Sequence, residues 1–330
     1  MKYSGIGGQA VIEGIMMRNG RKYSVGVRKP DGEICVDVKD RIPLTERWKI
    51  AGLPFIRGTF SFAESLIVGM STLMYSASFY EDDEGEAEPG RFEKWLEKTF
   101  GDRLDKVIMT VSMVFSVVLA MVLFMWLPLA IAGLIRKFVP SDTVMALIEG
   151  VLRVTIFILY IKLVSHTEDI RRTFMYHGAE HKCINCIEHG LPLSVDNVAV
   201  SSKEHKRCGT SFIVIVMIIG ILFFMVIRVQ NPLMRFLSRI VLLPVIAGVS
   251  YEFLRLAGRS DNPVVNALSR PGMWMQALTT YEPDDSMIEV AIAAVNAVFD
   301  WKVYQAENFP DGPDELGCRL LQKAQERNCA

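Results

Sequence analysis

An uncharged apolar run in the middle of the chain constrains the fold more than any other feature. The segment "VIMTVSMVFSVVLAMVLFMWLPLAIAGLI", Val107 to Ile135, carries no charged residue and lies between Lys106 and Arg136. A helix of about 20 apolar residues crosses the hydrocarbon core of a bilayer. This run is longer, so we expect it to span the membrane with a tilt or with a kink at Pro128.

Three further apolar stretches predict additional spans, two of which contain charged residues. In the second span, Glu149 and Arg153 stand four residues apart, so they share a helix face and can pair inside a bundle. The fourth span contains Glu252 and Arg255 in its second half. The predicted spans two to four are Val144–Val164, Phe212–Ile227 and Ile240–Ala257. The fold class is therefore mainly α, a multi-pass helical membrane protein with about four spans.

The composition indicates a water-exposed part beside the spans. Charged residues make up 22% of the chain, which is more than membrane helices alone carry. The net charge is −1 and the basic residues are scattered, so we expect no nucleic-acid partner. Six cysteines are too few for a disulfide-stabilised secreted domain, which favours a reducing compartment. The N-terminal residues lack an apolar signal sequence, so no cleaved signal peptide is expected.

The distribution of Lys and Arg predicts the orientation. With four spans, both termini and the loop from Ser165 to Ser211 lie on the same side of the membrane. That loop holds six Lys or Arg residues, whereas the short connections Arg136–Thr143 and Arg228–Arg239 hold two and three. Because cytoplasmic loops carry the excess of basic residues, we expect the termini and this His/Cys-rich loop in the cytosol and the spans in the inner membrane.

The flanking regions show weaker patterns. Valines that alternate with polar residues on both sides of "KPDG" predict a hairpin in a small N-terminal β unit. Leu53–Phe79 is apolar with a helical period and is expected to lie on the membrane or pack on the bundle. Ser286, followed by Glu289, predicts the start of a helix that covers the cytosolic unit. The polar tail after Glu307 is expected to be mobile.

These patterns predict seven consecutive regions. They are a β unit (1–52), an interfacial or packed helix (53–80), an acidic linker with a lead-in helix (81–106), two spans (107–164), the cytosolic loop (165–211), two spans (212–257) and a cytosolic helical segment with a mobile tail (258–330).

The stretch "YHGAEHKCINC" combines residue types that bind metal ions. On a helix His177 and His181 project from one face, at the spacing that two imidazoles need to bind one ion. With Glu180 they spell H-x-x-E-H, the pattern of the inverted zincins, in which the glutamate activates a water. Glu180 is therefore the candidate general base.

Further ligand types follow at short spacing. His205 and Cys208 are spaced H-x-x-C, and Cys186 closes a C-x-x-C with Cys183. We expect His177, His181, His205 and Cys208 to bind one zinc ion per chain, with Cys186 as a substitute. Four protein ligands would make the site structural, and three would leave a position for water. Glu252, about 70 residues on, is an alternative third ligand in the manner of the inverted zincins, although pairing with Arg255 is favoured.

Six segments together resemble one known family. The segments "GGQAVIEGIMMR", "VRKPDGEI", "YHGAEHK", "RCGTSF", "LPVIAGVSYEFLRLAGR" and "LTTYEPDDSMIEVAI" resemble, in this order, the YqhQ-like bacterial membrane family, classed as a domain of unknown function numbered 1385. The resemblance implies a multi-pass, metal-dependent protein with motif residues His177, Glu180, His181, His205 and Cys208. Lys206 stands where that family usually has proline. Cys183 stands where a threonine is frequent, which makes Cys186 the better ligand candidate.

Three functions remain open from the sequence. The first is a zinc-dependent hydrolase at the cytosolic membrane surface with Glu180 as general base. The second is a zinc-stabilised platform, without catalysis, that binds or assembles other membrane proteins. The third is transport, which rests on the charged residues within the spans. Replacing Glu180 by glutamine discriminates between the first two, because only a hydrolase needs a base.

Overall fold

A computed structural model describes residues 2–80, 104–227, 229, 231–260 and 262–329 of the chain. The chain divides into two compact units. Unit 1 comprises Met1–Tyr80, Ile161–Ile219 and Leu243–Ala330, and unit 2 comprises Glu81–Tyr160 and Gly220–Leu242. The predicted acidic linker lies outside the described residues.

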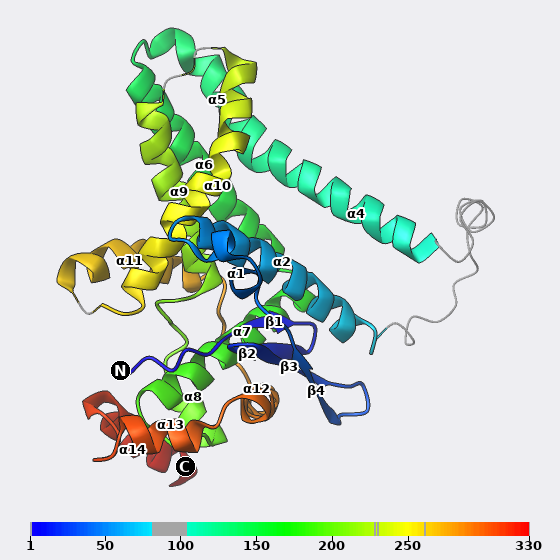
Figure 1. Cartoon of the computed structure of the whole chain (residues 1–330), viewed down its shortest axis with the longest axis vertical. Coiled ribbons are helices and arrows are strands. Elements are labelled where there is room, and N and C mark those ends of the chain that lie inside the picture. Colours follow the sequence, from blue (N-terminus) through cyan, green and yellow to red (C-terminus); the bar gives the residue numbers. More distant parts are fainter. Residues whose placement is uncertain (1, 81–103, 228, 230, 261, 330) are drawn as a thin grey trace. The chain divides into compact units, whose positions relative to one another are not determined.

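The N-terminal residues form a four-stranded antiparallel sheet in unit 1 (Figure 1). Its strands follow the chain in the order β1 (Gly7–Val11), β2 (Gly14–Asn19), β3 (Lys22–Arg28) and β4 (Ile34–Asp40). Arg28 pairs with Ile34 across the "KPDG" turn, in which Gly32 has a φ of 87°. The predicted hairpin is therefore confirmed as β3–β4, while β1 and β2 lie in a stretch for which the sequence favoured a turn into a single strand.

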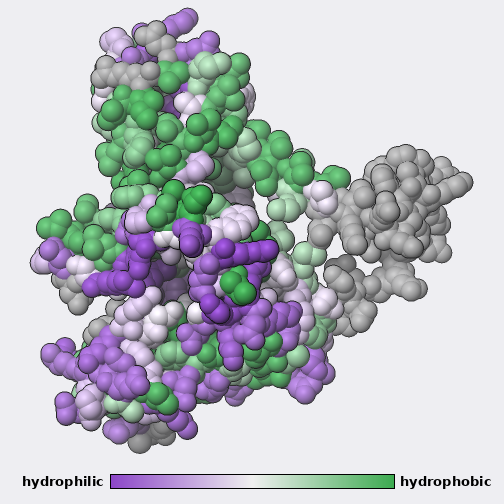
Figure 2. Space-filling model, in the orientation of Figure 1, coloured by the Kyte–Doolittle hydropathy of each residue, from purple (hydrophilic) through white to green (hydrophobic). Residues whose placement is uncertain are grey.

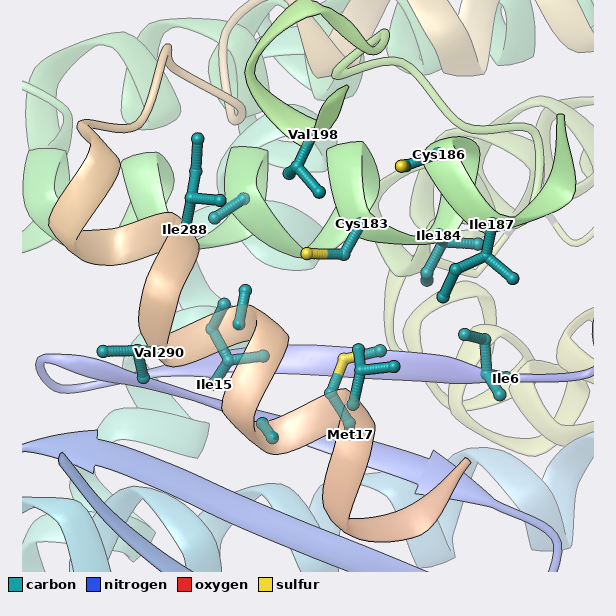
Figure 3. Packing of buried hydrophobic residues seen from close by; sticks show 14 of the residues in the cluster. Ile6, Ile15, Met17, Cys183, Ile184, Cys186, Ile187, Val198, Ile288 and Val290 are labelled. Atoms are coloured by element: carbon teal, nitrogen blue, oxygen red, sulfur yellow. The ribbon is translucent and has the colours of Figure 1, made fainter. Parts of the chain in front are cut away.

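Helices cover both faces of this sheet. Ile15 and Met17 of β2 point to a core formed with α7 (Glu168–Glu188) and α12 (Asp285–Val298), where Ile184 and Ile288 pack (Figure 3). Met16 points to the opposite face and packs in a second core with Val68 of α2 (Ile56–Ala77). Successive strand residues thus serve two cores, as the period of two requires.

The region from Leu53 to Phe79 forms the helix α2, which packs against other elements of unit 1. Within unit 1 its helix α2 meets the sheet at Gly69, where an added Cβ would lie 2.5 Å from the Gln9 side chain. It also meets α10 (Pro232–Ala257), because Thr59 Oγ1 donates to the Pro244 carbonyl at 2.8 Å. The helix α1 (Leu44–Arg47) and a short 3₁₀ helix (Lys49–Gly52) precede it.

The region from Ser165 to Ser211 is largely helical, although it was expected as a loop between spans. It contains α7, whose N-cap is Thr167, and α8 (Val195–Val200), capped by the Ser194 side chain. The histidine motif therefore lies on a long regular helix that packs against the sheet.

The helix predicted to start at Ser286 is present as α12 but starts slightly earlier, and the expectation of a mobile C-terminal tail is wrong. The N-cap of α12 is Asp284, whose Oδ1 accepts from Met287 N at 2.9 Å, and Ser286 lies inside the first turn. The tail that was expected to be mobile forms α14 (Glu315–Cys329), in which Leu320 and Ala324 are buried. The remaining helices of this region are α11 (Pro263–Gln276) and α13 (Trp301–Asn308).

Within the described residues, four helical segments are long and apolar enough to cross a membrane, and α2 is not among them. They are Thr110–Phe138, Asp142–Val164, Gly209–Val226 and Leu233–Ala257. The first consists of α4 (Leu104–Met121), a π-helical turn (Val122–Trp126), α5 (Leu127–Ile135) and a 3₁₀ turn (Arg136–Phe138), and the next two are α6 and α9. Figure 2 shows hydrophobic residues over these helices. The predicted fold class is confirmed.

The structure adds the cause of the irregularity at Pro128 and changes the predicted start of the fourth span. The π-helical turn directly precedes Pro128, and the Phe124 carbonyl, which proline cannot bond, accepts from Arg153 Nε at 2.9 Å. The helix that contains the fourth span, α10, begins at Pro232, and its apolar segment begins at Leu233 rather than at Ile240. Arg235 and Arg239, which were counted in a connection, therefore lie within the helix.

Candidate metal centre

Three potential ligands come together in unit 1. His177 and His181 lie one turn apart on α7, with ring centroids 4.5 Å apart. Cys208 directly precedes α9, and its Sγ lies 3.2 Å from His177 Nε2. One ligand atom from each of the three residues lies within 4.8 Å of the others. This spacing suits a single ion bound by two nitrogens and one sulfur.

Backbone carbonyl groups orient both imidazoles. His177 Nδ1 lies 2.9 Å from the Thr279 oxygen, and His181 Nδ1 lies 2.6 Å from the Lys203 oxygen. A carbonyl oxygen only accepts hydrogen bonds, so each Nδ1 carries the proton and donates it. The Nε2 atoms therefore face the ligand group, as in most metal-binding histidines, and an ion that binds displaces the proton between His177 Nε2 and the Cys208 sulfur.

The electrostatic environment favours a thiolate at Cys208. Burial alone would raise the pKa of this thiol, but the charges of His177 and His181 hold that pKa well below its ordinary value. Burial disfavours the proton on His177, yet the adjacent Cys208 thiolate raises the pKa of His177 to about 9. The Thr210 backbone N–H also donates to Cys208 Sγ, at 3.3 Å. The thiolate is the form of cysteine that binds metal ions.

Glu180 is buried beside the three candidate ligands, on α7 with the two histidines. Burial raises its pKa, and the charges of His181 and His177 act in the opposite direction. The Gly8 backbone N–H also lowers the pKa of this carboxyl. A Cβ on Gly8 would lie 3.0 Å from Glu180 Cγ and 2.5 Å from the Met16 oxygen, so only glycine leaves room here. In the sequence this contact corresponds only to the glycine pair Gly7–Gly8 at the start of β1, which gave no indication of a partner.

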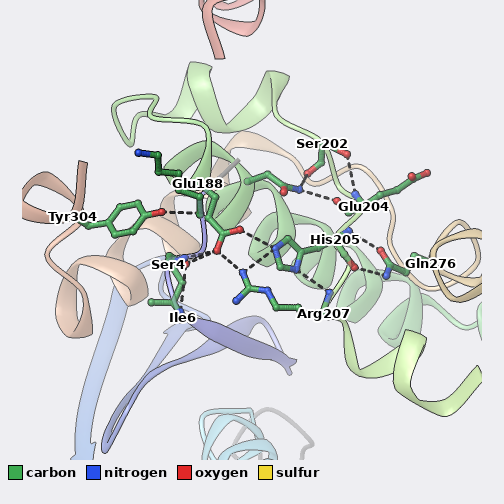
Figure 4. A network of polar contacts seen from close by, with 11 residues as sticks. Ser4, Ile6, Glu188, Ser202, Glu204, His205, Arg207, Gln276 and Tyr304 are labelled. Carbon is green, nitrogen blue, oxygen red and sulfur yellow. Dashed lines mark hydrogen bonds and ion pairs between the residues drawn. The ribbon is translucent and has the colours of Figure 1, made fainter. Parts of the chain in front are cut away.

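The structure does not bring His205 into the ligand group. Its Nδ1 accepts from the Arg207 N–H at 3.4 Å, and its Nε2 lies 3.4 Å from Glu188 Oε2, to which it donates (Figure 4). Both ring nitrogens are thus engaged, although the ring centroid lies only 5.8 Å from that of His181. The expected four-ligand set becomes a three-ligand set.

Glu188 is the centre of the network that holds His205. It is fully buried, and it accepts hydrogen bonds from Ser4 N at 2.8 Å, from Ser4 Oγ at 2.6 Å and from Arg207. Burial opposes its ionisation, but the His205 hydrogen bond and the charge of Arg207 lower the pKa of Glu188 to about 2. The network fixes the segment that carries Cys208 against the N-terminal residues and α7 (Figure 4).

The other two ligand candidates lie elsewhere. Cys186 Sγ faces the carbonyl oxygens of Leu191 and Pro192, at 3.7 and 3.6 Å, and burial raises its pKa to about 12. Glu252 accepts a hydrogen bond from Arg57 Nε at 2.6 Å. Its ion-pair partner is therefore Arg57 rather than the expected Arg255, and it does not belong to the group of His177, His181 and Cys208.

Comparisons with known proteins agree with the resemblance in the sequence. Residues 53–301 match the family model described as "Protein of unknown function (DUF1385)". The chain is 34% identical over 303 residues to "Uncharacterized protein YqhQ" of Bacillus subtilis (strain 168), which covers 92% of this chain and 94% of that protein. No solved structure matches the chain.

Proposed function

The chain belongs to the DUF1385 family of proteins of unknown function, and from this premise we propose that it is a membrane-embedded, zinc-dependent hydrolase. The active site contains His177, His181 and Cys208 as ligands of one Zn²⁺ ion and Glu180 as general base. Its substrates are reached from the cytosolic surface of the inner membrane.

The number of ligands is the observation that carries this proposal. Structural zinc sites almost always have four protein ligands, whereas catalytic sites have three and keep one position for water or substrate. The group contains three ligand residues, and both nitrogens of the neighbouring His205 are engaged by other partners. A soft thiolate with two imidazoles favours zinc over magnesium or calcium.

The zinc ion and the protein side chains contribute different parts of the proposed reaction. Zinc, when bound, acts as a Lewis acid and lowers the pKa of water. Glu180 accepts the proton of the attacking water, and burial, which raises its pKa, makes it a stronger base than an exposed glutamate. The Gly8 backbone packs closely against the Glu180 side chain and restricts its position. The carbonyl groups of Thr279 and Lys203 keep both imidazoles oriented.

Two observations support a site at the cytosolic surface. Cys208 directly precedes α9, which is apolar enough to span, so the ligand group lies at the end of that helix. The region from Ser165 to Ser211, which supplies all three ligands, holds six Lys or Arg residues. By the positive-inside rule, this region and both termini are cytosolic.

A second candidate function is a zinc-stabilised platform, without catalysis, that binds or assembles other membrane proteins. The burial of Glu180, His181 and Cys208 favours it, because a substrate must reach the ion. Under this alternative Glu180 has a structural role only.

An open coordination position separates the two functions without knowledge of the substrate. We would replace zinc by cobalt in the purified protein and add acetohydroxamate, a ligand of open catalytic sites. The hydrolase proposal predicts a change in the cobalt absorption spectrum. An unchanged spectrum at saturating hydroxamate would favour the platform. Glu180→Gln should keep one cobalt per chain in either case, and under the first proposal it should abolish hydrolysis in a screen of peptide and ester substrates.

A further inference from the structure

The segment that leads into α2 exposes a series of large apolar side chains. Ile50, Leu53 and Phe55 are 68%, 50% and 57% exposed. Trp48 and Ile56, on either side of them, are exposed as well. Large apolar side chains that are exposed close together mark a surface that contacts a protein or a membrane. The proposed metal centre makes no use of this segment.

Within unit 1 this segment lies against the middle of a helix that is apolar enough to span a membrane. The apolar part of α10 is 25 residues long and begins at Leu233. A Cβ on Gly248 would lie 1.9 Å from the Phe55 oxygen. Thr59 Oγ1 donates to the Pro244 carbonyl at 2.8 Å. Both contact points on α10 lie within three residues of the middle of its apolar part, which is about 5 Å along the helix axis.

The charged residues of this segment suit such a depth. Arg57 of α2 forms an ion pair with Glu252 of α10, in which Arg57 Nε donates at 2.6 Å. A charge at hydrocarbon depth is costly unless a counter-charge lies beside it, and here each residue supplies the counter-charge of the other. Lys49 stands beside Trp48 at the start of the segment. Lysine and tryptophan are the residue types that occupy the lipid headgroup level.

The irregular backbone before α2 has partners for its polar groups, as hydrocarbon requires. The N–H groups of Ala51 and Leu53 donate to the carbonyl oxygens three residues before them, at 3.0 and 3.2 Å. Pro54 has no N–H. The N–H of Phe55, the N-cap of α2, donates to Glu252 Oε1 at 3.2 Å. None of these four residues therefore presents an unpaired backbone donor to lipid.

Both ends of the segment lead back to the N-terminal sheet. Strand β4 precedes it, and α2 runs from α10 to the sheet (Figure 1). Along α2, Phe62 packs on Phe212 near the start of α9, with ring centroids 5.3 Å apart. Closer to its end, Ser76 Oγ accepts from the Ile12 N–H between β1 and β2 at 3.1 Å. Because the chain leaves the sheet and returns to it, the segment enters the membrane without crossing it.

We propose that residues 48–59 form a re-entrant segment, which inserts into the bilayer beside α10 and contacts lipid acyl chains. Trp48 and Lys49 lie at the headgroup level, and the stretch from Ile50 to Phe55 lies in the hydrocarbon region. The inference rests on the fold of unit 1 and is independent of the metal centre and its chemistry.

Photocrosslinking of the full-length protein in phospholipid nanodiscs tests this proposal. The amino acid p-benzoylphenylalanine is placed at position 55, where its ring replaces that of Phe55, and ultraviolet light bonds it to C–H groups beside it. We expect the protein mass to rise by the mass of one phospholipid. After alkaline hydrolysis of the lipid esters in the digested protein, one fatty acid should remain on the peptide, because the bond is to an acyl chain. Val38 of β4, which is 46% exposed, is the control position and should give no lipid adduct.

The same probe at Ile50 keeps the proposal testable if the protein with the probe at position 55 does not fold. A covalent dimer in place of a lipid adduct would overturn the proposal, because a second copy would then cover the segment. An adduct that retains the glycerol headgroup part after hydrolysis would place the segment on the membrane surface and would also overturn it. Absence of a lipid adduct at both positions, or equal adducts at Phe55 and Val38, would contradict insertion as well.

Discussion

Replacing Glu188 by glutamine should destabilise unit 1 strongly, although the two side chains have nearly the same shape. The carboxylate is fully buried and accepts hydrogen bonds from Ser4, from the Arg207 guanidinium and from the neutral His205 ring. The variant removes the negative charge and leaves the Arg207 guanidinium, whose side chain is 14% exposed, with a neutral partner.

Two independent routes give the magnitude. The pKa of Glu188 is about 2, against an ordinary value of 4.5. That difference corresponds to about 3 kcal/mol of stability. Removing one partner from a buried ion pair typically costs about 3–5 kcal/mol. We therefore expect Glu188→Gln to lower the free energy of unfolding by about 3 kcal/mol at pH 7.

The same pKa predicts a pH dependence with a definite sign. The pKa is depressed in the folded state, so the stabilisation is fully present above about pH 4.5 and is lost as the pH falls toward 2. The stability of the wild-type protein should fall across this window, and that of Glu188→Gln should change less.

Urea unfolding in detergent, followed by tryptophan fluorescence, measures both effects. Glu315→Gln is the matched control, because Glu315 forms an exposed pair with Arg319 one turn away on α14. Such surface pairs contribute little, so the unfolding midpoint of the control should hardly move. A loss below about 1 kcal/mol for Glu188→Gln, or equal losses in the two variants, would refute this account of the network.

Two further variants test contacts around the site. Gly8→Ala should lower the free energy of unfolding by about 2 kcal/mol or more, because its Cβ would lie 2.5 Å from the Met16 oxygen. Gly7→Ala is the control and should be tolerated, because a Cβ on Gly7 has nothing within 4 Å. Similar unfolding midpoints for the two variants would contradict the Gly8 contact. Glu252→Gln should lower the free energy of unfolding by about 1 kcal/mol, because the ion pair with Arg57 is lost. The zinc content should stay unchanged. Loss of zinc in this variant would indicate that Glu252 is a metal ligand.

Local patterns predicted the spans and the hairpin well, because each depends on residues close in sequence. A long apolar run predicts a helix that is long and apolar enough to cross a membrane. The error at the start of the fourth span has a physical cause: Arg239 was treated as a boundary, but it is paired with Glu149 inside the helices. A charged residue that pairs with a residue on another helix can lie inside a membrane-spanning helix rather than at its end. The sequence does not indicate which residue that partner is.

The candidate site was predictable only in part. The spacing of His177 and His181 on a helix fixes their proximity, and the structure places Cys208, another candidate from the sequence, beside them. His205 was indistinguishable from Cys208 as a ligand candidate, because its engagement by Glu188 and Arg207 depends on tertiary packing. The orienting carbonyl groups of Thr279 and Lys203 belong to the backbone, so no side-chain pattern could reveal them.

The zinc content of purified protein, measured by elemental analysis, tests the central claim most directly. We predict one zinc per chain in the wild-type protein and in His205→Ala, and none in His177→Ala or Cys208→Ser. Absence of metal from the wild-type protein, after purification without chelators and with zinc supplied, would contradict the metal centre. Loss of zinc in His205→Ala from a protein that remains folded would contradict the three-ligand arrangement and with it the open position for catalysis.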